Sequence, residues 1–234
     1  MLAHQFLFFT EKIDLKNKTL LLENEEFNHL FKVLRKNKDL PFQVTDGKGK
    51  IFLAKAKEFY KKSCKAEILE TLVDEPENEN KITLAVGILH SNRFDFLVEK
   101  CSELGIKKII PIKSQNVKEK VRLERWKKIS VSALKQSGGN WLTEVVEPIS
   151  FAQVLELSTS FPQRLIAHEE FVESSKESLS KDSETLILVG SEKGFSEEEV
   201  TKVLTKNFQS LSLGKRRLRT ETASIVACAL LLKK

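Results

Sequence analysis

The 234-residue sequence has little of what defines several common kinds of protein. Its three cysteines, Cys64, Cys101 and Cys228, are odd in number and far apart, so they predict neither a disulfide framework nor paired metal ligands. No apolar run reaches the roughly 18 residues that a membrane span needs. The first residues lack the cationic flank and apolar stretch of a signal peptide. We therefore expect a cytoplasmic protein in a reducing compartment.

Motifs for several kinds of chemistry are also missing. The sequence has no Gly-x-Gly-x-x-Gly after a strand, no Gly-Lys-Ser/Thr phosphate loop and no Gly-x-Ser-x-Gly elbow. The four histidines, His4, His29, His90 and His168, show no metal-ligand spacing. We therefore expect no metal cofactor. The motifs of dinucleotide binding, phosphate-loop chemistry and serine hydrolysis are also absent.

What the sequence does have is a local excess of positive charge. Residues 93–128 hold eleven Lys and Arg against five Asp and Glu, an excess of six that equals the net charge of +6 of the whole chain. A basic band beside a sheet suits an RNA backbone. A solvated helix face would explain the same composition equally well.

The first seventy-odd residues are rich in predicted strands. We expect an edge strand over 4–9, another strand at 20–22, and a hairpin whose turn is Asp46-Gly47. Phe27, Leu30, Phe31 and Leu34 have the i, i+3, i+4, i+7 spacing of an amphipathic helix. Its other faces carry His29, Lys32 and Arg35, which form either a solvated face or a phosphate-contacting patch.

A change of rhythm follows the acidic segment 74–80, which contains a proline, has no apolar residue and is the best linker in the chain. Beyond it, predicted strands alternate with predicted helices, which indicates an α/β domain with a mostly parallel sheet covered on both faces. The strands are expected at 82–89, 109–112, 165–167 and 186–189, and the helices at 94–104 and 122–136.

Two glycine-bearing loops near the C-terminus are the candidate ligand site, since ligands of open α/β sheets bind beyond the carboxyl ends of strands. In the first loop, Glu192 lies between Gly190 and Gly194, and Ser196 and Glu199 form a capping box that begins a helix. The acidic residues disfavour an anion, so a neutral or cationic ligand fits better.

In the second loop, Gly214 is expected to end a strand, and Thr220 or Thr222 to begin a last helix that is apolar almost all round. Such a helix must be buried in the core, in an interface, or in both. Either loop alone fits a routine strand-to-helix turn. Two such loops within 35 residues are a more specific sign of a ligand site.

Segments along nearly the whole chain resemble the RsmE family, ribosomal RNA small subunit methyltransferase E, of the SPOUT class. The most specific segment is Leu213-Gly214 through Leu218-Arg219-Thr220-Glu221-Thr222-Ala223, and the others are 29–35, 100–106, 133–137 and 189–195. The resemblance implies an N-terminal PUA-like β-barrel for RNA over 1–73, a linker over 74–81, and a SPOUT methyltransferase domain with a trefoil knot over 82–234. The sequence pattern alone does not predict a knot, because knots are very rare in proteins.

The resemblance also implies a homodimer that uses S-adenosylmethionine to methylate N3 of a uridine in small-subunit (16S) rRNA, as naked RNA or within the assembled small ribosomal subunit. RNA contacts are then expected from Arg93 and Gln136 as well as His29, Lys32 and Arg35. Cofactor contacts are expected from Ala167, Val189, Gly190, Glu192, Gly194, Leu211, Ser212, Leu213, Gly214, Leu218 and Arg219.

Three residues are candidates for the chemistry. Uracil N3 is a poor nucleophile until its imide proton leaves, so catalysis needs a base or an environment that stabilises the uracil anion. Arg219 is permanently protonated and cannot be the base, but it can stabilise negative charge on a uracil oxygen. Glu192 or Glu221 could accept the proton, directly or through water. Glu221 could equally be an ordinary first-turn helix charge.

The sequence departs from the family pattern at several positions. Ser191 and Lys193 replace the Pro and the second Gly of Gly-Pro-Glu-Gly-Gly, and Gly139 stands where an Arg is usual. Gln115-Asn116 replaces an Arg-Ser pair, and His90-Ser91 replaces Lys-Gly. Several of the lost groups would face RNA. One alternative is therefore a protein of the same fold that binds RNA or ribosomes with weak or no catalysis. A second alternative, a nucleotide-dependent phosphotransferase that uses the same glycine loops, is disfavoured because the sequence has no phosphate-loop lysine.

Overall fold

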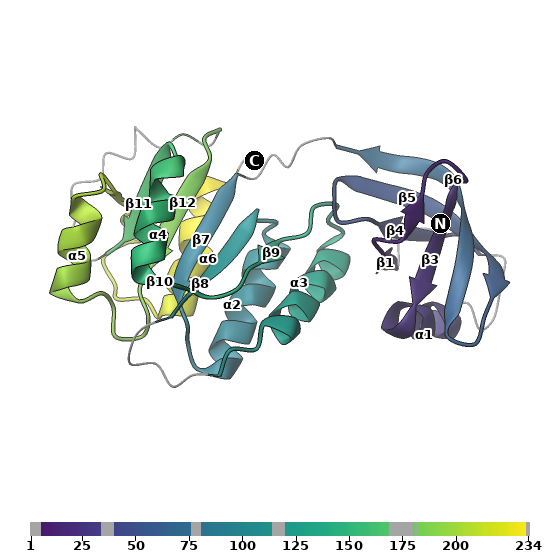
Figure 1. Ribbon diagram of the computed structural model, residues 1–234, viewed down its shortest axis with the longest axis horizontal. Helices are drawn as coiled ribbons and strands as arrows, with labels where there is room; N and C mark the ends of the chain where they lie inside the picture. The colour runs from purple at the N-terminus through teal and green to yellow at the C-terminus, as the bar shows by residue number, and fades with distance from the viewer. Residues whose placement is uncertain are drawn as a thin grey trace. The chain divides into compact units, whose positions relative to one another are not determined.

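The computed structural model describes residues 6–33, 40–75, 81–113, 120–168, 180 and 182–232. The chain forms two compact units, Met1–Asn78 with Val131–Leu142, and Glu79–Ser130 with Thr143–Lys234 (Figure 1). Several predictions fall outside the described residues: His4, Arg35, Gln115-Asn116 and most of the linker over 74–81.

Among the described residues, the first unit holds a six-stranded sheet, the helix α1 (Asn24–Val33) and the second half of the helix α3 (Leu123–Ser137). The sheet order is β1-β4-β5-β6-β3-β2, and all neighbours are antiparallel except β1 and β4. The predicted edge position of the first strand is therefore confirmed. The strands are β1 (Leu7–Phe9), β2 (Ile13–Asp14), β3 (Thr19–Glu23), β4 (Phe42–Thr45), β5 (Lys50–Phe59) and β6 (Ser63–Asp74).

The predicted hairpin is confirmed, because β4 and β5 pair in antiparallel register around the Asp46 turn. The Asp46 carboxylate accepts hydrogen bonds from the backbone N–H groups of Lys48 (2.7 Å) and Lys50 (3.0 Å). Gly47 has a φ of +67°, a backbone conformation that side chains disfavour. An aspartate that bonds the backbone ahead of it and a glycine in the left-handed region together fix the turn.

The amphipathic helix α1 covers the core of the first unit, with Phe27 and Leu30 buried as predicted. Phe31 departs from the expected apolar stripe, because 53% of its surface is exposed. Once positions i and i+3 face the sheet, position i+4 lies at the edge of the stripe. The ring of Phe31 packs on that of Phe27, 6.1 Å between centroids.

The second unit is a parallel sheet of order β10-β8-β7-β12-β11-β13, with β9 paired to β8. The predicted parallel α/β architecture is confirmed. The central strands β7 (Ile82–Gly87) and β12 (Thr185–Val189) are buried along their whole length, as strands covered on both faces must be. The other strands are β8 (Lys108–Lys113), β9 (Glu144–Val145), β10 (Ile149–Ser150), β11 (Gln163–Ala167) and β13 (Gln209–Ser210).

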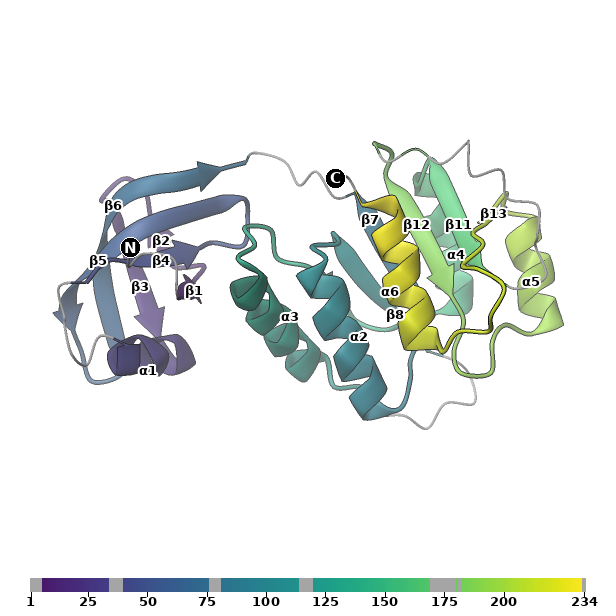
Figure 2. The ribbon, with the colours of Figure 1, turned by 180° about the vertical axis from the view of Figure 1, so that it is seen from behind.

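Helices lie on both faces of this sheet (Figures 1 and 2). One face packs on α2 (Ser91–Glu103), the first half of α3 (Leu123–Ser137) and α6 (Thr220–Leu231). The other packs on α4 (Phe151–Leu157) and α5 (Glu197–Leu204). A 3₁₀ turn over Ser158–Ser160 follows α4.

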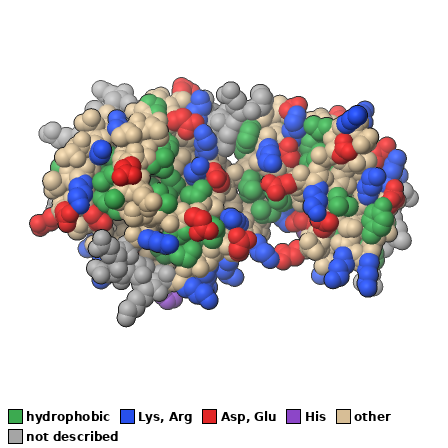
Figure 3. Space-filling view, in the orientation of Figure 1, with side chains coloured by type: hydrophobic (Ala, Val, Ile, Leu, Met, Phe, Trp, Pro, Cys, Tyr) green, Lys and Arg blue, Asp and Glu red, His purple; other side chains and the backbone are tan. Residues whose placement is uncertain are grey.

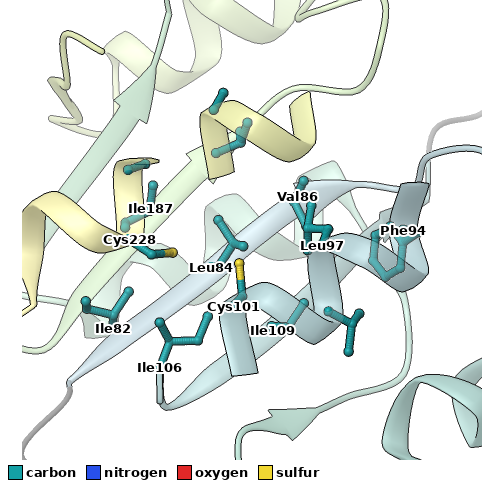
Figure 4. Close-up of a cluster of buried hydrophobic side chains, with 14 of the residues drawn as sticks. Ile82, Leu84, Val86, Phe94, Leu97, Cys101, Ile106, Ile109, Ile187 and Cys228 are labelled. Carbon is teal, nitrogen blue, oxygen red and sulfur yellow. The ribbon is translucent and has the colours of Figure 1, made fainter. Parts of the chain in front are cut away.

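All three cysteines are buried and free. Figure 4 shows Cys101 of α2 and Cys228 of α6 among the apolar side chains of the second unit, with their sulfur atoms turned toward each other. Their contact and burial raise the pKa of Cys228 well above its ordinary value, and burial raises the pKa of Cys64 to about 11. The thiols of Cys64 and Cys228 therefore stay protonated at neutral pH, and all three cysteines serve as small core residues.

The expectation that a strand runs to Gly214 is wrong, because β13 ends at Ser210. The backbone N–H of Leu211 still donates to the Ile166 carbonyl at 2.9 Å, and the chain then leaves the sheet. Leu213 packs on the core instead of pairing with a strand, and Gly214 adopts a φ of +109°. The last helix begins at Thr220 as predicted, although Arg219 is its N-cap and supplies no side-chain cap.

Candidate active site at the carboxyl edge of the sheet

The two glycine loops leave the sheet of the second unit side by side. Val189, the last residue of β12, pairs with Ala167, the last residue of β11. β11 also pairs with β13, and its Ile166 carbonyl accepts from Leu211. The loops 190–196 and 211–219 therefore start at the same edge of the sheet, as Figure 2 shows. This is the edge at which open parallel sheets bind ligands.

The first loop is a tight turn with no room on its inner side. The N–H of Gly194 donates to the Ser191 carbonyl at 2.9 Å, and Gly194 has a φ of +75°. A Cβ added to Gly190 would lie 2.9 Å from the carbonyl carbon of Gly194, and one added to Gly87 would lie 2.7 Å from the Ser191 backbone. Only glycine at these two positions lets the backbones approach this closely.

The departures from the family pattern in this loop fit the observed backbone. Neither Ser191 nor Lys193 has a positive φ, so neither side chain strains the turn. The Lys193 side chain is exposed. Replacement of a glycine by Lys193 therefore leaves the turn intact.

The second loop combines buried apolar anchors with an open stretch. Leu211 is buried, and Leu213 and Leu218 pack half-buried on the core. At Gly214 an added Cβ would meet no atom within 4 Å. At Gly214 the loop therefore borders open space, with half-buried leucine side chains in the same loop, which suits the planar face and hydrogen-bonding edge of a nucleoside.

The two exposed catalytic candidates are placed differently. Glu192 forms an ion pair with Arg93 of α2, with 2.8 Å between Oε1 and Nη1. The sequence predicted both residues but not their contact, which joins positions 99 apart. The Arg219 side chain is exposed at the start of α6 and has no carboxylate partner among the described residues.

Glu221, the third candidate, is not an ordinary solvated helix charge. Only 8% of its surface is exposed, and its Oε2 atom has no hydrogen-bond partner among the described residues. Buried carboxylate oxygens without donors are costly. The sequence alone did not decide between a proton acceptor and an ordinary helix charge at Glu221, since a first-turn glutamate is common on both buried and exposed helix faces.

The described residues expected to bind RNA are divided between the two units. His29 and Lys32 of α1 and Gln136 of α3 belong to the first unit, and all three are exposed. The ring of His29 packs against those of Phe6 and Phe8, with centroids 5.8 and 5.2 Å away. Arg93 belongs to the second unit.

A cleft of about 960 Å³ lies beside the first loop, and no sequence motif predicted it. Its walls come from the loop 190–196, the segment 87–90 at the end of β7, and helices α4 and α5. The capping box of Ser150 and Gln153, which begins α4, was a usable signal for a helix at this edge. Among the described residues, no cluster of His, Cys, Asp or Glu could hold a metal ion, and no helix has the length and apolarity to cross a membrane.

Comparisons with known proteins agree with this geometry. Residues 76–232 match the RNA methyltransferase domain family, and residues 22–69 match the RNA methyltransferase PUA domain family. The chain is 32% identical to ribosomal RNA small subunit methyltransferase E of Mesomycoplasma hyopneumoniae (strain 232), over 88% of this chain and 90% of the relative. For the protein of that description from Bacillus subtilis (strain 168), identity is 32%, over 89% and 88%.

A solved structure is similar over nearly the whole chain. It is a ribosomal RNA small subunit methyltransferase E from Neisseria gonorrhoeae bound to S-adenosyl methionine. The TM-score is 0.82 and the sequence identity 32%, over 97% of this chain and 96% of that one.

Proposed function

The chain belongs to the ribosomal RNA small subunit methyltransferase E family, and from this premise we propose that it transfers a methyl group from S-adenosylmethionine to N3 of a uridine in 16S rRNA. The observation that carries the proposal is the common origin of the loops 190–196 and 211–219 at one edge of the parallel sheet. We assign residues 1–73 to RNA binding and 82–234 to catalysis, with a trefoil knot, and we place the protein in the cytoplasm with its ribosomal substrate.

The cofactor fits the residues at this edge. In the proposed pocket, Gly190 and Gly194 shape one wall, and Gly214 with the half-buried Leu213 and Leu218 forms the other. Ala167, Val189, Leu211 and Ser212 complete the proposed pocket. When bound, S-adenosylmethionine supplies an electrophilic methyl group on a sulfonium sulfur.

The protein's own contribution is to the uracil. The N3 proton must leave before N3 attacks the methyl carbon and the sulfur–carbon bond breaks. Glu192, exposed and held by Arg93, is the proposed acceptor of this proton. We assign to the guanidinium of Arg219, which has no carboxylate partner among the described residues, the stabilisation of the negative charge that develops on a uracil oxygen. Glu221 is buried, and we assign it to supporting the start of α6 and so the position of Arg219.

The alternative, an RNA-binding protein with weak catalysis, was motivated by Ser191, Lys193 and Gly139, and none of these residues distorts the local backbone. Ser191 and Lys193 leave the first loop unstrained. Gly139 follows the C-terminal turn of α3, where its N–H donates to the Leu134 carbonyl at 3.0 Å. Methyl transfer is therefore the better-supported function.

The direct test is the modified nucleoside itself. We expect 3-methyluridine to be missing from 16S rRNA of a strain without this gene and restored by complementation, as measured by mass spectrometry of rRNA nucleosides. Tritium transfer to naked 16S rRNA and to assembled small subunits from that strain would identify the substrate form. Unchanged 3-methyluridine in the deletion strain would overturn the proposal.

Gly190→Ala is expected to weaken cofactor binding about tenfold or more. The added Cβ would push on the Gly194 backbone and displace the loop. The cofactor would then lose one or two hydrogen bonds to the loop backbone, of about 0.5–1.5 kcal/mol each, which corresponds to roughly tenfold weaker binding. Calorimetry with S-adenosylmethionine measures it. Lys193→Ala is the control, since the Lys193 side chain is exposed, and its affinity should match that of the wild type. Equal affinity in both variants would remove Gly190 from the pocket.

We also propose a homodimer that buries the outer face of α6. This helix leaves Thr222, Ala229 and Leu230 exposed, and Leu230 is 49% exposed. A charge in an apolar interface is costly, so Leu230→Glu is expected to raise the dimer dissociation constant at least roughly tenfold. Sedimentation equilibrium gives the mass of each species. A wild-type protein with the mass of one chain at micromolar concentration would contradict the dimer.

A further inference from the structure

The cleft beside the first loop has the size and position of a substrate site. Its volume of about 960 Å³ lies within the range of small-molecule sites in proteins, roughly 300–1,000 Å³. Val189, Gly190, Glu192 and Gly194, which we assign to the cofactor edge, also line it. The cleft therefore shares the first loop with the proposed active site and extends from that loop toward α4 and α5, and the second loop does not line it.

A row of three aromatic rings runs from the carboxyl edge of the sheet into this cleft. His168 directly follows β11, and its ring centroid lies 6.2 Å from that of Phe195. Phe195 in turn lies 6.2 Å from Phe151, the first residue of α4, with the ring planes tilted by 52°. Phe151 and Phe195 are half-buried and line the cleft. Half-buried aromatic rings that face a cleft are a stacking surface for a base.

The charges of the cleft suit an uncharged ring better than a polyanion. Its four lysines (Lys113, Lys193, Lys202 and Lys206) are matched by four glutamates (Glu156, Glu192, Glu198 and Glu199). Lys202 is also held by Glu198 at 2.5 Å. Figure 3 shows apolar side chains gathered on this face of the second unit, with acidic and basic side chains around them. A phosphate-binding groove would need an excess of positive charge.

We propose that this cleft receives the target uracil after the nucleotide has swung out of the RNA, with the base stacked on Phe151, whose ring packs against that of Phe195, and with its N3 edge toward Glu192. This inference rests on the proposed methyl transfer to uridine. A base inside a helix hides its N3 edge, and enzymes that modify bases draw them into a pocket with aromatic walls. Phe151 and Phe195 are then substrate-positioning residues.

The test compares variants of Phe151 in the full-length protein. Tritium transfer to 16S rRNA lacking the modification gives kcat and KM, and calorimetry gives the affinity for S-adenosylmethionine. Loss of one stacking partner should lower kcat/KM about tenfold or more in Phe151→Ala, with cofactor affinity within about twofold of the wild type. Phe151→Leu keeps the apolar volume without the π face and should be equally impaired, whereas Phe151→Tyr should restore transfer. Leu157→Ala, on an exposed position of α4, is the control.

The outcomes separate this inference from the proposed function. If the wild type methylates uridine and Phe151→Leu does so equally well, the stacking site is wrong although the methyltransferase stands. If Phe151→Ala is impaired only on assembled subunits and not on naked 16S rRNA, the cleft binds a ribosomal protein and the proposal fails. If the wild type itself transfers no methyl group to uridine, the proposed function fails first. Thermal unfolding of each variant identifies a loss that comes from misfolding, and Phe195→Leu then provides the same comparison at the second ring.

Discussion

Replacing Arg219 with alanine is expected to lower kcat for methyl transfer by about 10²–10³-fold, the usual effect of removing a donor that stabilises a developing anion. The guanidinium of Arg219 has no carboxylate partner among the described residues, so its charge is free to act on the substrate. Cofactor affinity should remain near that of the wild type, because the backbone rather than this side chain shapes the pocket. Tritium transfer and calorimetry measure the two quantities.

Arg216→Ala is the matched control for this prediction. Arg216 is exposed on the same basic loop, so its removal changes the net charge equally but leaves the start of α6 unaltered. We expect a small rise in KM for RNA and an unchanged kcat. Equal kcat values in Arg219→Ala and the wild type would show that Arg219 does not stabilise the reacting uracil.

The parts of the fold that the sequence predicted are those with strong local signals. The mostly apolar runs of β7 and β12 are too short for a typical buried helix, and their length predicted central strands of a covered sheet. The capping box at Ser196 fixed the start of α5, and the hairpin at Asp46-Gly47 follows from turn chemistry. Each of these features depends on residues close together in the chain.

What the sequence could not predict depends on contacts between distant residues. The ion pair of Arg93 with Glu192 joins α2 to a loop 99 positions away, and neither residue carries a local sign of it. The burial of Glu221 is set by the packing of α6 on the second unit's core. The cleft required Phe151 and Phe195 to come together from different helices and loops. The resemblance to a family located the loops but not these contacts.

The strand that was expected to reach Gly214 shows the same limit on a smaller scale. The run Leu211-Ser212-Leu213 alternates apolar and polar residues as a strand would, but Leu213 packs on the core outside the sheet. Period-two alternation reports which side chains are buried, and a loop crossing a sheet edge can bury the same side chains. In the proposed function, this loop outside the sheet forms one wall of the cofactor pocket.

Glu192→Gln carries the second large effect. Glutamine keeps the size of the side chain and a hydrogen bond to Arg93, but it cannot accept the N3 proton. General-base groups typically contribute 10²–10⁴-fold, so we expect kcat to fall by about 10²-fold or more with little change in cofactor affinity. Single-turnover tritium transfer at saturating RNA isolates the chemical step from product release.

Glu197→Gln is the control, because Glu197 is an exposed first-turn residue of α5 just beyond the same loop. Its loss of charge should leave the single-turnover rate unchanged. A fall in both variants would indicate a general effect of charge near the loop rather than proton transfer. If Glu192→Gln kept the wild-type rate, the base would lie elsewhere, and Glu221→Gln would then decide whether the buried carboxylate at the start of α6 takes part directly. A rate lost only at Glu192 would identify this carboxylate as the group that accepts the N3 proton.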